Sequence, residues 1–301
     1  MTELRVEVEG RTLTISNLDK VLFPRTGTTK GEVLNYYAQV APVLLPQLRD
    51  RAVTRIRWPH GVEGSSFFEK NTPPGTPSWV RTAEVPTTGS RASTGAGTIR
   101  FPICDDLPTL TWLANLASLE LHVHQWRVAE DGTPLRPDRL VIDLDPGEPA
   151  GLHECAVVAL MVRDALAQRG MTCTPVTSGS KGLHLYADLD PDVVGDLDSD
   201  GSTELAREVA EGLQKENPTL VTATMTKAKR GGKVFLDWSQ NSGSKTTVAP
   251  YSLRGKERPT VAFPITWEEV EEGAEDELAL DQLGMEEAVA RVLDQGDAFS
   301  A

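Results

Sequence analysis

The stretch Leu140–Gly147, LVIDLDPG, decides the fold class and the candidate chemistry of this chain of 301 residues. Its apolar part, Leu140–Leu144, is closed by a Pro-Gly pair, as in a buried strand that ends in a turn. Asp143 and Asp145 stand two residues apart, and side chains two apart on a strand leave the same face. Two like charges on one buried face need a cation, a shared proton or water nearby. The pattern therefore indicates a site for Mg²⁺ or Mn²⁺, although an Asp-Pro-Gly turn without chemistry is the alternative.

Strands and helices are expected to alternate after this segment. Helices are predicted over 152–169 and 202–215, and strands over 172–177, 182–189 and 233–238. This alternation predicts a mixed α/β core with active-site groups at strand ends. Before it, we expect a hairpin over 3–15, a helix over 27–48 capped by Thr29, a strand over 51–59, a loop over 87–98, and a helical or part-helical stretch over 108–126.

We expect one domain, 1–301, with three parts. An N-terminal lobe (1–125) packs against the mixed α/β lobe (126–265), and the chain ends in an acidic segment (266–301). That segment carries twelve acids and one base, so residues 1–265 hold only −3 of the net charge of −14. A local groove can then be positive enough for nucleic acid despite the acidic total.

The composition excludes other classes of protein. The chain has three cysteines, and their odd number and wide spacing argue against a disulfide framework or a Cys-rich zinc site. It has no run of eighteen apolar residues, so no membrane partner is expected. A reduced, cytoplasmic setting fits these features.

A third carboxylate follows another apolar strand in KVFLDWSQN (233–241). Asp237 comes directly after the apolar residues Val234–Leu236, just as Asp143 comes directly after the apolar residues 140–142. A third carboxylate would complete a two-metal site, which activates an attacking hydroxyl and neutralises departing pyrophosphate.

A candidate phosphate loop lies between these two signals, in TSGSKGLHLY (177–186). Its glycines let backbone N–H groups approach phosphate oxygens, while Ser178, Lys181 and His184 add donors and charge. An ordinary surface turn is the alternative, because the Walker spacing is absent. Lys245 and Arg254 supply further basic groups downstream. A basic cluster in TKAKRGGK would contact a triphosphate or a DNA backbone, or is a solvated basic loop: Lys227, Lys229, Arg230 and Lys233.

The ordered set DLDPG (143–147), TSGSKGLHLY (177–186) and KVFLDWSQNSGSKTTVAPYSLRG (233–255) resembles the polymerase domain of bacterial ligase D, within the archaeo-eukaryotic primase superfamily. The resemblance extends through ISNLDKVLFP, GTTKGEVLNYYAQVAP, RWPHGVEGSSFFEK and LASLELHVHQWR, so it covers nearly the whole chain. It implies a primase-polymerase fold of the mixed α/β class, with an RRM-like catalytic sheet and an interlocked N-terminal α/β lobe.

The resemblance also implies roles for single residues. Two Mn²⁺ or Mg²⁺ ions would be held by Asp143, Asp145 and Asp237. The incoming nucleotide would be held by Ser178, Lys181, His184, Arg254 and Lys245, with His122 beside a ribose hydroxyl. A downstream DNA 5′-phosphate would lie against Asn17, Lys20 and Lys30. Phe67 and Phe68 would stack on template bases, as aromatic faces do on any base, and Lys227 and Arg230 would make other DNA contacts.

Some positions depart from the family pattern, and for others the residues alone would give a different prediction. Ile56 stands where the family often carries a basic residue, which would weaken one phosphate or primer contact. The loop over 87–98 looks longer than in the family, where such loops help to hold two DNA ends together, so end bridging does not follow from the resemblance. Without the resemblance, Phe67 and Phe68 would be predicted as core, and His122 as a buried histidine in a helix. DLDSDG (196–201) begins like a calcium loop, but Arg207 stands where the required Glu should be, so a solvated acidic turn is expected.

The implied activity is template-directed addition of NTPs or dNTPs to a 3′-hydroxyl, with ribonucleotides preferred. The implied setting is gap filling at broken DNA with a 5′-phosphate during non-homologous end joining, at the nucleoid, with Ku and an ATP-dependent DNA ligase as partners. Two alternatives remain: a de novo primase, and a non-catalytic module that binds DNA ends. A nuclease is weaker, because the nucleotide loop would then lack a purpose.

Overall fold

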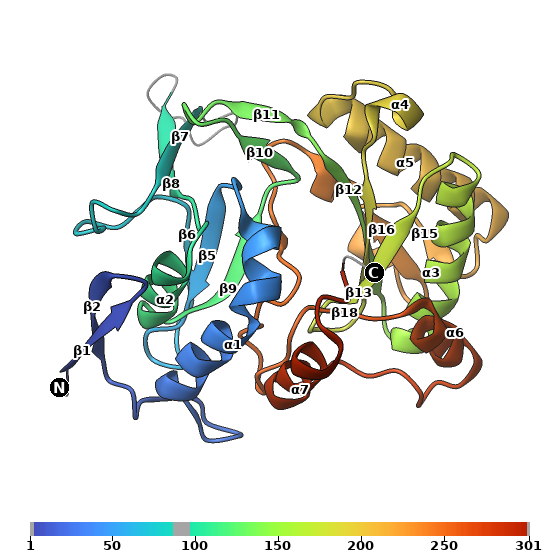
Figure 1. Cartoon of the computed structure of the whole chain (residues 1–301). Helices are drawn as coiled ribbons and strands as arrows, with labels where there is room; N and C mark the ends of the chain where they lie inside the picture. The colour runs from blue at the N-terminus through green and yellow to red at the C-terminus, as the bar shows by residue number, and fades with distance from the viewer. Residues whose placement is uncertain (1–2, 87–96, 300–301) are drawn as a thin grey trace.

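The computed structural model describes residues 3–86 and 97–299, and it places two lobes side by side (Figure 1). One lobe is built on a six-stranded sheet with the order β15-β16-β12-β14-β13-β18. The other contains a four-stranded sheet with the order β17-β9-β5-β6. Helices and sheets from both halves of the chain therefore confirm the mixed α/β class.

The six-stranded sheet is centred on the segment that decided the fold. Its central strand β12 (Arg139–Pro146) runs antiparallel to both neighbours, β14 (Leu183–Asp188) and β16 (Val234–Asp237). The outer strands are β13 (Cys173–Thr177), β15 (Val221–Thr222) and β18 (Phe263–Pro264). The predicted strands over 172–177, 182–189 and 233–238 are confirmed, each within about two residues.

Side chains alternate along β12, so that one face of the strand packs on the core and the other carries the carboxylates. Leu140, Ile142 and Leu144 have no exposed surface and join the main core, together with side chains of α3 (Leu152–Ala167) and α5 (Ser199–Glu216). Asp143 and Asp145 alternate with these residues, so they leave the opposite face, which the two helices do not cover. The hydrophobic effect on one face thereby directs the carboxylates toward the other lobe.

The N-terminal lobe begins with the hairpin β1 (Glu3–Val8) and β2 (Arg11–Ser16), as predicted. The helix α1 (Lys30–Leu48) starts at Thr29, whose hydroxyl and backbone form a reciprocal capping box with Glu32. The sheet of this lobe combines β5 (Val53–Arg57), β6 (Phe67–Glu69), β9 (Ser118–Val123) and β17 (Thr247–Val248). Because β17 follows β12, β14 and β16 in sequence, the chain returns to the first lobe and interlocks the two.

The predicted helical stretch over 108–126 is only partly correct. The helix α2 (Leu107–Asn115) ends there, Ala117 adopts a φ of +57°, and β9 begins at Ser118. The expectation of a buried helical histidine at position 122 is therefore wrong. The signal for a strand was present, because SLELHV alternates polar and apolar residues with period two.

The remaining described elements frame the two sheets. Short strands form three further pieces: β3 (Val21–Phe23) with β4 (Thr28–Thr29), β7 (Thr82–Pro86) with β8 (Thr98–Pro102), and β10 (Trp126–Val128) with β11 (Pro134–Pro137). The acidic segment forms helices, α6 (Trp267–Glu275) and α7 (Met285–Gln295), and α7 lies at the junction of the lobes in Figure 1. Short helical turns complete the described chain: α4 (Pro191–Val194), η1 (Lys227–Lys229) and η2 (Trp238–Asn241).

Two sequence expectations have other outcomes. The predicted loop over 87–98 lies mostly outside the described residues, and Thr98 already belongs to β8. The expected acidic turn over 196–201 is in part the start of α5, where Asp198 caps the helix by accepting a hydrogen bond from the Gly201 backbone at 2.8 Å. Within the described ranges, no helix has the length and apolar character needed to cross a membrane.

Candidate active site

Three strands bring the predicted carboxylates to one row of the six-stranded sheet. Asp143 on β12 pairs with His184 on β14 and with Asp237 on β16. Cross-strand partners point to the same face with neighbouring Cβ atoms, and Asp145 lies two residues further along that face. His184 Nε2 lies 3.5 Å from Asp143 Oδ1. The structure thus brings together four predicted site residues, Asp143, Asp145, His184 and Asp237, of which the first and the last are 94 positions apart in sequence.

Gln240, on η2 directly after β16, joins two of these carboxylates. Its side-chain amide donates to Asp237 Oδ2 at 3.0 Å and lies 3.4 Å from Asp143 Oδ2. The other Asp237 oxygen accepts hydrogen bonds from the backbone and hydroxyl of Ser239, at 3.1 and 2.5 Å. The carboxylates are therefore held in place by donors that leave lone pairs free for a cation.

Burial and mutual repulsion disfavour negative charge on this row. Burial, followed by the charges of Asp145 and Asp237, raises the pKa of Asp143 well above its usual value. The pKa of Asp145 is also raised, by desolvation and by Asp237, although Arg230, Lys181 and Arg254 oppose the rise. Burial lowers the pKa of His184 to about 3, assisted by Arg254 and His122, so this imidazole is neutral. An added cation is the natural counter-charge for such a row.

The donor set suits a hard divalent ion that is completed by substrate. In the described part of the chain, no group of three or more His, Cys, Asp or Glu side chains forms a ready-made metal site. Mg²⁺ is usually held by one or two carboxylates together with waters and substrate phosphates, so a full protein cage is not required. The residues therefore fit an ion that binds with the nucleotide.

The candidate phosphate loop lies at the start of β14, beside this row. The Ser178 hydroxyl accepts hydrogen bonds from the backbone of Ser180 at 3.2 Å and of Gly182 at 3.1 Å. Gly179 has a φ of +65°, and a Cβ on Gly182 would stand 1.8 Å from the Leu144 carbonyl oxygen. Only glycine fits at Gly182, because the loop packs directly against the end of β12. Ser178 thus shapes the loop from within.

The predicted basic residues differ in how exposed they are and in which side chains they contact. Lys181 is exposed and lies 3.8 Å from Glu148, while the Arg230 guanidinium stacks over Phe235, the cross-strand partner of Asp145. Lys245 hydrogen-bonds to Ser239 beside Asp237, and Lys227 is exposed on η1. Lys181, Arg230 and Lys245 therefore approach the carboxylates from three segments of the chain.

The other lobe contributes His122 from β9. Its Nε2 lies 2.8 Å from a carboxylate oxygen of Glu120, which also contacts Arg254 at 3.3 Å. Arg254 Nη1 donates to the Ser178 carbonyl oxygen at 2.5 Å. His122 and Arg254 therefore approach the carboxylate row from across the junction of the lobes, as their influence on the pKa of His184 also indicates.

A separate pocket of about 170 Å³ contains the three residues predicted for a DNA 5′-phosphate. Asn17, Lys20 and Lys30 line it together with Arg57 and Asn115. Lys30 is 4% exposed, and its ammonium donates to the Ser16 carbonyl oxygen at 2.6 Å and to Asn115 Oδ1 at 2.7 Å. Burial, and then the charge of Lys20, lowers its pKa to about 8. Two cations that repel each other in a small pocket are suited to an anion.

Phe67 and Phe68 lie on the edge strand β6 and are 46% and 59% exposed. The reading of both residues as core is therefore wrong. Phe67 pairs across the strands with Arg57 and Phe68 pairs with Ile56. An exposed aromatic pair beside a basic pocket is an arrangement that can stack on bases.

Four residues around these sites were missed by the sequence reasoning: Glu120, Gln240, Asn115 and Arg57. Glu120 and Gln240 stood inside motifs that were quoted, but only spatial contacts show what they hold. The alternation of β9 signals that Glu120 and His122 share a face, while no local pattern signals Asn115.

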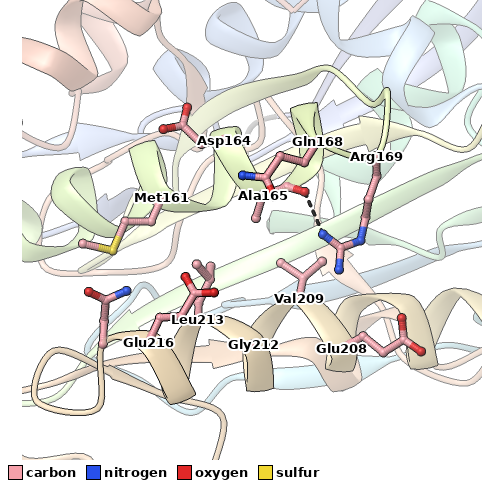
Figure 2. Close-up of a pocket in the computed structure, with 11 residues that line it drawn as sticks. Met161, Asp164, Ala165, Gln168, Arg169, Glu208, Val209, Gly212, Leu213 and Glu216 are labelled. Carbon is pink, nitrogen blue, oxygen red and sulfur yellow. Dashed lines mark hydrogen bonds between the residues drawn. The ribbon is translucent and has the colours of Figure 1, made fainter.

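A hollow of about 380 Å³ lies on the opposite side of the six-stranded sheet, between α3 and α5 (Figure 2). Its lining includes Asp164, Glu208 and Glu216, with Arg169 donating to the Ala165 carbonyl oxygen at 2.8 Å. None of the predicted site residues lines it. Its acidic rim is unsuited to phosphate groups.

The chain is similar to known proteins over most of its length. The family model described as "LigD, primase-polymerase domain" matches residues 29–299. The chain is 50% identical over 290 residues to the multifunctional non-homologous end joining protein LigD of Mycobacterium bovis, covering 95% of this chain and 36% of that protein. It is 35% identical over 259 residues to the bifunctional LigD of Bacillus subtilis, covering 86% of this chain and 39% of that protein. The chain thus spans well under half the length of these relatives.

A solved structure shares the whole fold. It is described as the polymerase domain from Mycobacterium tuberculosis ligase D in complex with DNA, and it superposes with a TM-score of 0.86 at 49% identity. The match covers 95% of this chain and 96% of that one. The expected primase-polymerase architecture is therefore confirmed.

Proposed function

Because the chain belongs to the family of LigD primase-polymerase domains, we propose that it is a template-directed nucleotidyltransferase that fills gaps at broken DNA ends. It adds nucleoside triphosphates, ribonucleotides in preference to deoxyribonucleotides, to a primer 3′-hydroxyl and releases pyrophosphate. The setting is double-strand-break repair by non-homologous end joining at the nucleoid, with Ku and an ATP-dependent DNA ligase as partners. The relatives' names as end-joining proteins support that setting.

The observation that carries the proposal is the row Asp237–Asp143–His184 beside the Ser178–Gly182 loop. Carboxylates that resist ionisation without a cation lie next to a glycine loop with an exposed lysine, Lys181, and an arginine, Arg254. Nucleotidyl transfer requires these two elements side by side, because the metal and the triphosphate must share a centre. A nuclease would have no use for the loop.

The residues divide the work. Asp143, Asp145 and Asp237 would hold Mn²⁺ or Mg²⁺, two ions in the complete site, which would lower the cost of ionising the attacking hydroxyl and stabilise charge on the phosphates. Arg254, Lys181 and Lys245 neutralise the triphosphate, and His184 lies against it as a neutral donor. His122 faces the sugar from the other lobe. The backbone of the Ser178–Gly182 loop orients the phosphates.

The N-terminal lobe, 1–125, positions DNA for this chemistry. The 5′-phosphate across the gap is bound by Asn17, Lys20 and Lys30. The template bases stack on Phe67 and Phe68. Lys227 and Arg230 add backbone contacts at the mouth of the catalytic lobe, 126–265. The acidic segment, 266–301, supports the junction through α7, which contacts α1.

Primer extension on a gapped duplex tests the proposal. The purified chain is incubated with Mn²⁺, a duplex with a 5′-phosphorylated gap, and either NTPs or dNTPs, and the products are resolved by length. We expect templated extension, faster with NTPs. Dinucleotide formation without primer would identify a de novo primase instead, and tight binding of the end without any extension would identify a non-catalytic end-binding module.

A further inference from the structure

Glu120 lies at the junction of the two lobes and touches both sides of the candidate nucleotide site. Its carboxylate is 5% exposed, and its Oε2 atom lies 2.8 Å from His122 Nε2. Its Oε1 atom accepts a hydrogen bond from the Gly255 backbone at 2.9 Å and lies 3.3 Å from Arg254 Nε. One carboxylate therefore holds the histidine that faces the sugar and the arginine that faces the phosphates.

The ionisation of Glu120 decides which nitrogen of His122 carries hydrogen. Burial alone would raise the pKa of Glu120, but His122, Arg254 and the Gly255 N–H outweigh it and lower the pKa to about 2. An ionised carboxylate only accepts hydrogen bonds, so His122 Nε2 must be the donor. In a neutral imidazole, the other nitrogen, Nδ1, is then an acceptor.

The Nδ1 atom is open to a ligand. Among residues 3–86 and 97–299, no hydrogen bond to His122 Nδ1 is present, and the side chain keeps 14% of its surface exposed. On the other side of Glu120, Arg254 is held through Nη1 by Ser178 in the catalytic lobe. Glu120 thus fixes both groups while leaving each with a free polar edge.

We propose that Glu120 is a positioning residue that holds His122 with its Nδ1 lone pair toward the incoming nucleotide, where it accepts a hydrogen bond from the 2′-hydroxyl. The same carboxylate orients Arg254 for the triphosphate. This inference rests on the proposed function and deepens it, because it names the atom that distinguishes ribose from deoxyribose. A 2′-hydrogen offers this acceptor no donor, and a 2′-fluorine offers only further lone pairs.

Three nucleotides distinguish an acceptor from a donor at Nδ1. We would measure kcat and KM for ATP, dATP and 2′-fluoro-dATP on the gapped duplex. One neutral hydrogen bond predicts a KM for ATP about fivefold to tenfold lower than for dATP, with 2′-fluoro-dATP no better than dATP. A fluorinated nucleotide as good as ATP would show that His122 donates there, which overturns the inference.

Glu120→Gln should reverse the order of dATP and 2′-fluoro-dATP. Two donors, Gly255 N–H and Arg254, face one end of the side chain, so the amide oxygen turns to them and the amide NH₂ faces His122. His122 Nε2 must then accept, and the hydrogen moves to Nδ1. We expect 2′-fluoro-dATP to overtake dATP and the KM for all three to rise as Arg254 loosens. An equal rise without reordering would indicate a merely structural Glu120.

Glu269→Gln is the matched control, because Glu269 pairs with Arg291 on α6 and α7, outside the nucleotide site. It should leave the three KM values and their order unchanged. A reordering by this variant as well would count against a specific role for Glu120.

The tautomer can be measured without turnover, by ¹⁵N NMR of the histidine-labelled full chain, with His122 assigned from His122→Gln. The inference predicts hydrogen on Nε2 in the wild type and on Nδ1 in Glu120→Gln. A wild-type His122 with hydrogen on Nδ1 overturns the inference even if primers are extended. Failure of the wild type to bind or add any nucleotide overturns the proposed function, and with it the sugar role, whatever the tautomer.

Discussion

Asp143 and Asp237 are direct cross-strand partners, and the side-chain amide of Gln240 lies within 3.4 Å of both carboxylates. They are far apart in sequence because α3, β13, β14 and α5 lie between them along the chain, yet β16 is the direct neighbour of β12 in the sheet. The consequence is a pair of like charges whose repulsion is offset by one neutral amide donor. Both the chemistry and the stability of the chain should respond to this arrangement.

Replacing Asp143 by Asn should stabilise the metal-free chain while abolishing primer extension. The raised pKa of Asp143 means that its charge is unfavourable in the folded state, so stability falls as pH rises from the unfolded pKa toward the folded one, and the penalty persists above both values. Removing that charge should gain about 1 kcal/mol or more, which corresponds to roughly 1–2 °C per kcal/mol in melting temperature for a chain of 301 residues.

Calorimetry with and without Mn²⁺ checks this prediction. The wild type should gain stability from the ion and Asp143→Asn should gain little. Extension that survives in Asp143→Ala and Asp145→Ala would remove the metal assignment altogether.

Recognition of a 5′-phosphate should weaken as pH rises through about 8. The pKa of Lys30 is lowered to about 8, so the free pocket loses this charge above that value. For folding the sign is opposite: the unfolded chain binds the Lys30 proton up to its ordinary pKa of 10.5, so stability rises between about 8 and 10.5.

Binding of phosphorylated and unphosphorylated gaps, measured by fluorescence anisotropy from pH 7 to 9.5, tests the pocket. Loss of one charge-assisted contact should reduce the preference about tenfold or more. Lys30→Met should show little preference and no such pH dependence, and Lys20→Ala should also lower the preference. Equal binding of the two gaps by the wild type would disprove the pocket.

Phe67→Ala and Phe68→Ala should weaken template binding with little effect on folding. Stacking on a base is worth about 1–3 kcal/mol, so affinity for gapped DNA should fall about fivefold or more. Both side chains are about half exposed, so the free energy of unfolding should change by less than about 0.5 kcal/mol. Leu278→Ala, at an 85% exposed position in the acidic segment, is the control that should change neither quantity. Unchanged DNA affinity in both Phe variants would reject the stacking role.

Gly182→Ala should destabilise the chain by about 3 kcal/mol or more, since its Cβ would stand 1.8 Å from the backbone oxygen of Leu144. The backbone of β12 would have to move, and the carboxylate row with it. Gly212→Ala on α5 is the matched control, because a Cβ there meets nothing within 4 Å and alanine is the better helix former by about 0.5–1 kcal/mol. Chemical denaturation should therefore give opposite signs for the two variants.

The sequence by itself determined the local elements and the chemistry they carry. The period of LVIDLDPG placed Asp143 and Asp145 on one face, and the Thr29 capping signal gave the start of α1. These features could be predicted because side-chain periodicity and helix capping depend on neighbours within a few residues. The same kind of reasoning failed at His122, where a helix was extended across the turn at Ala117 although SLELHV already alternated.

Tertiary structure alone decided which of these groups meet. Nothing local predicts that Asn115 holds the Lys30 ammonium, or that Glu120 links His122 to Arg254, 134 residues along the chain from Glu120. The first contact arises because α1 packs against α2, and the second because β17 returns to the first sheet and brings the Tyr251–Gly255 segment to Glu120. Burial then strengthens the electrostatic coupling between these neighbours. Water would screen such charges at the surface, but where the lobes exclude water the charges shift each other's pKa values.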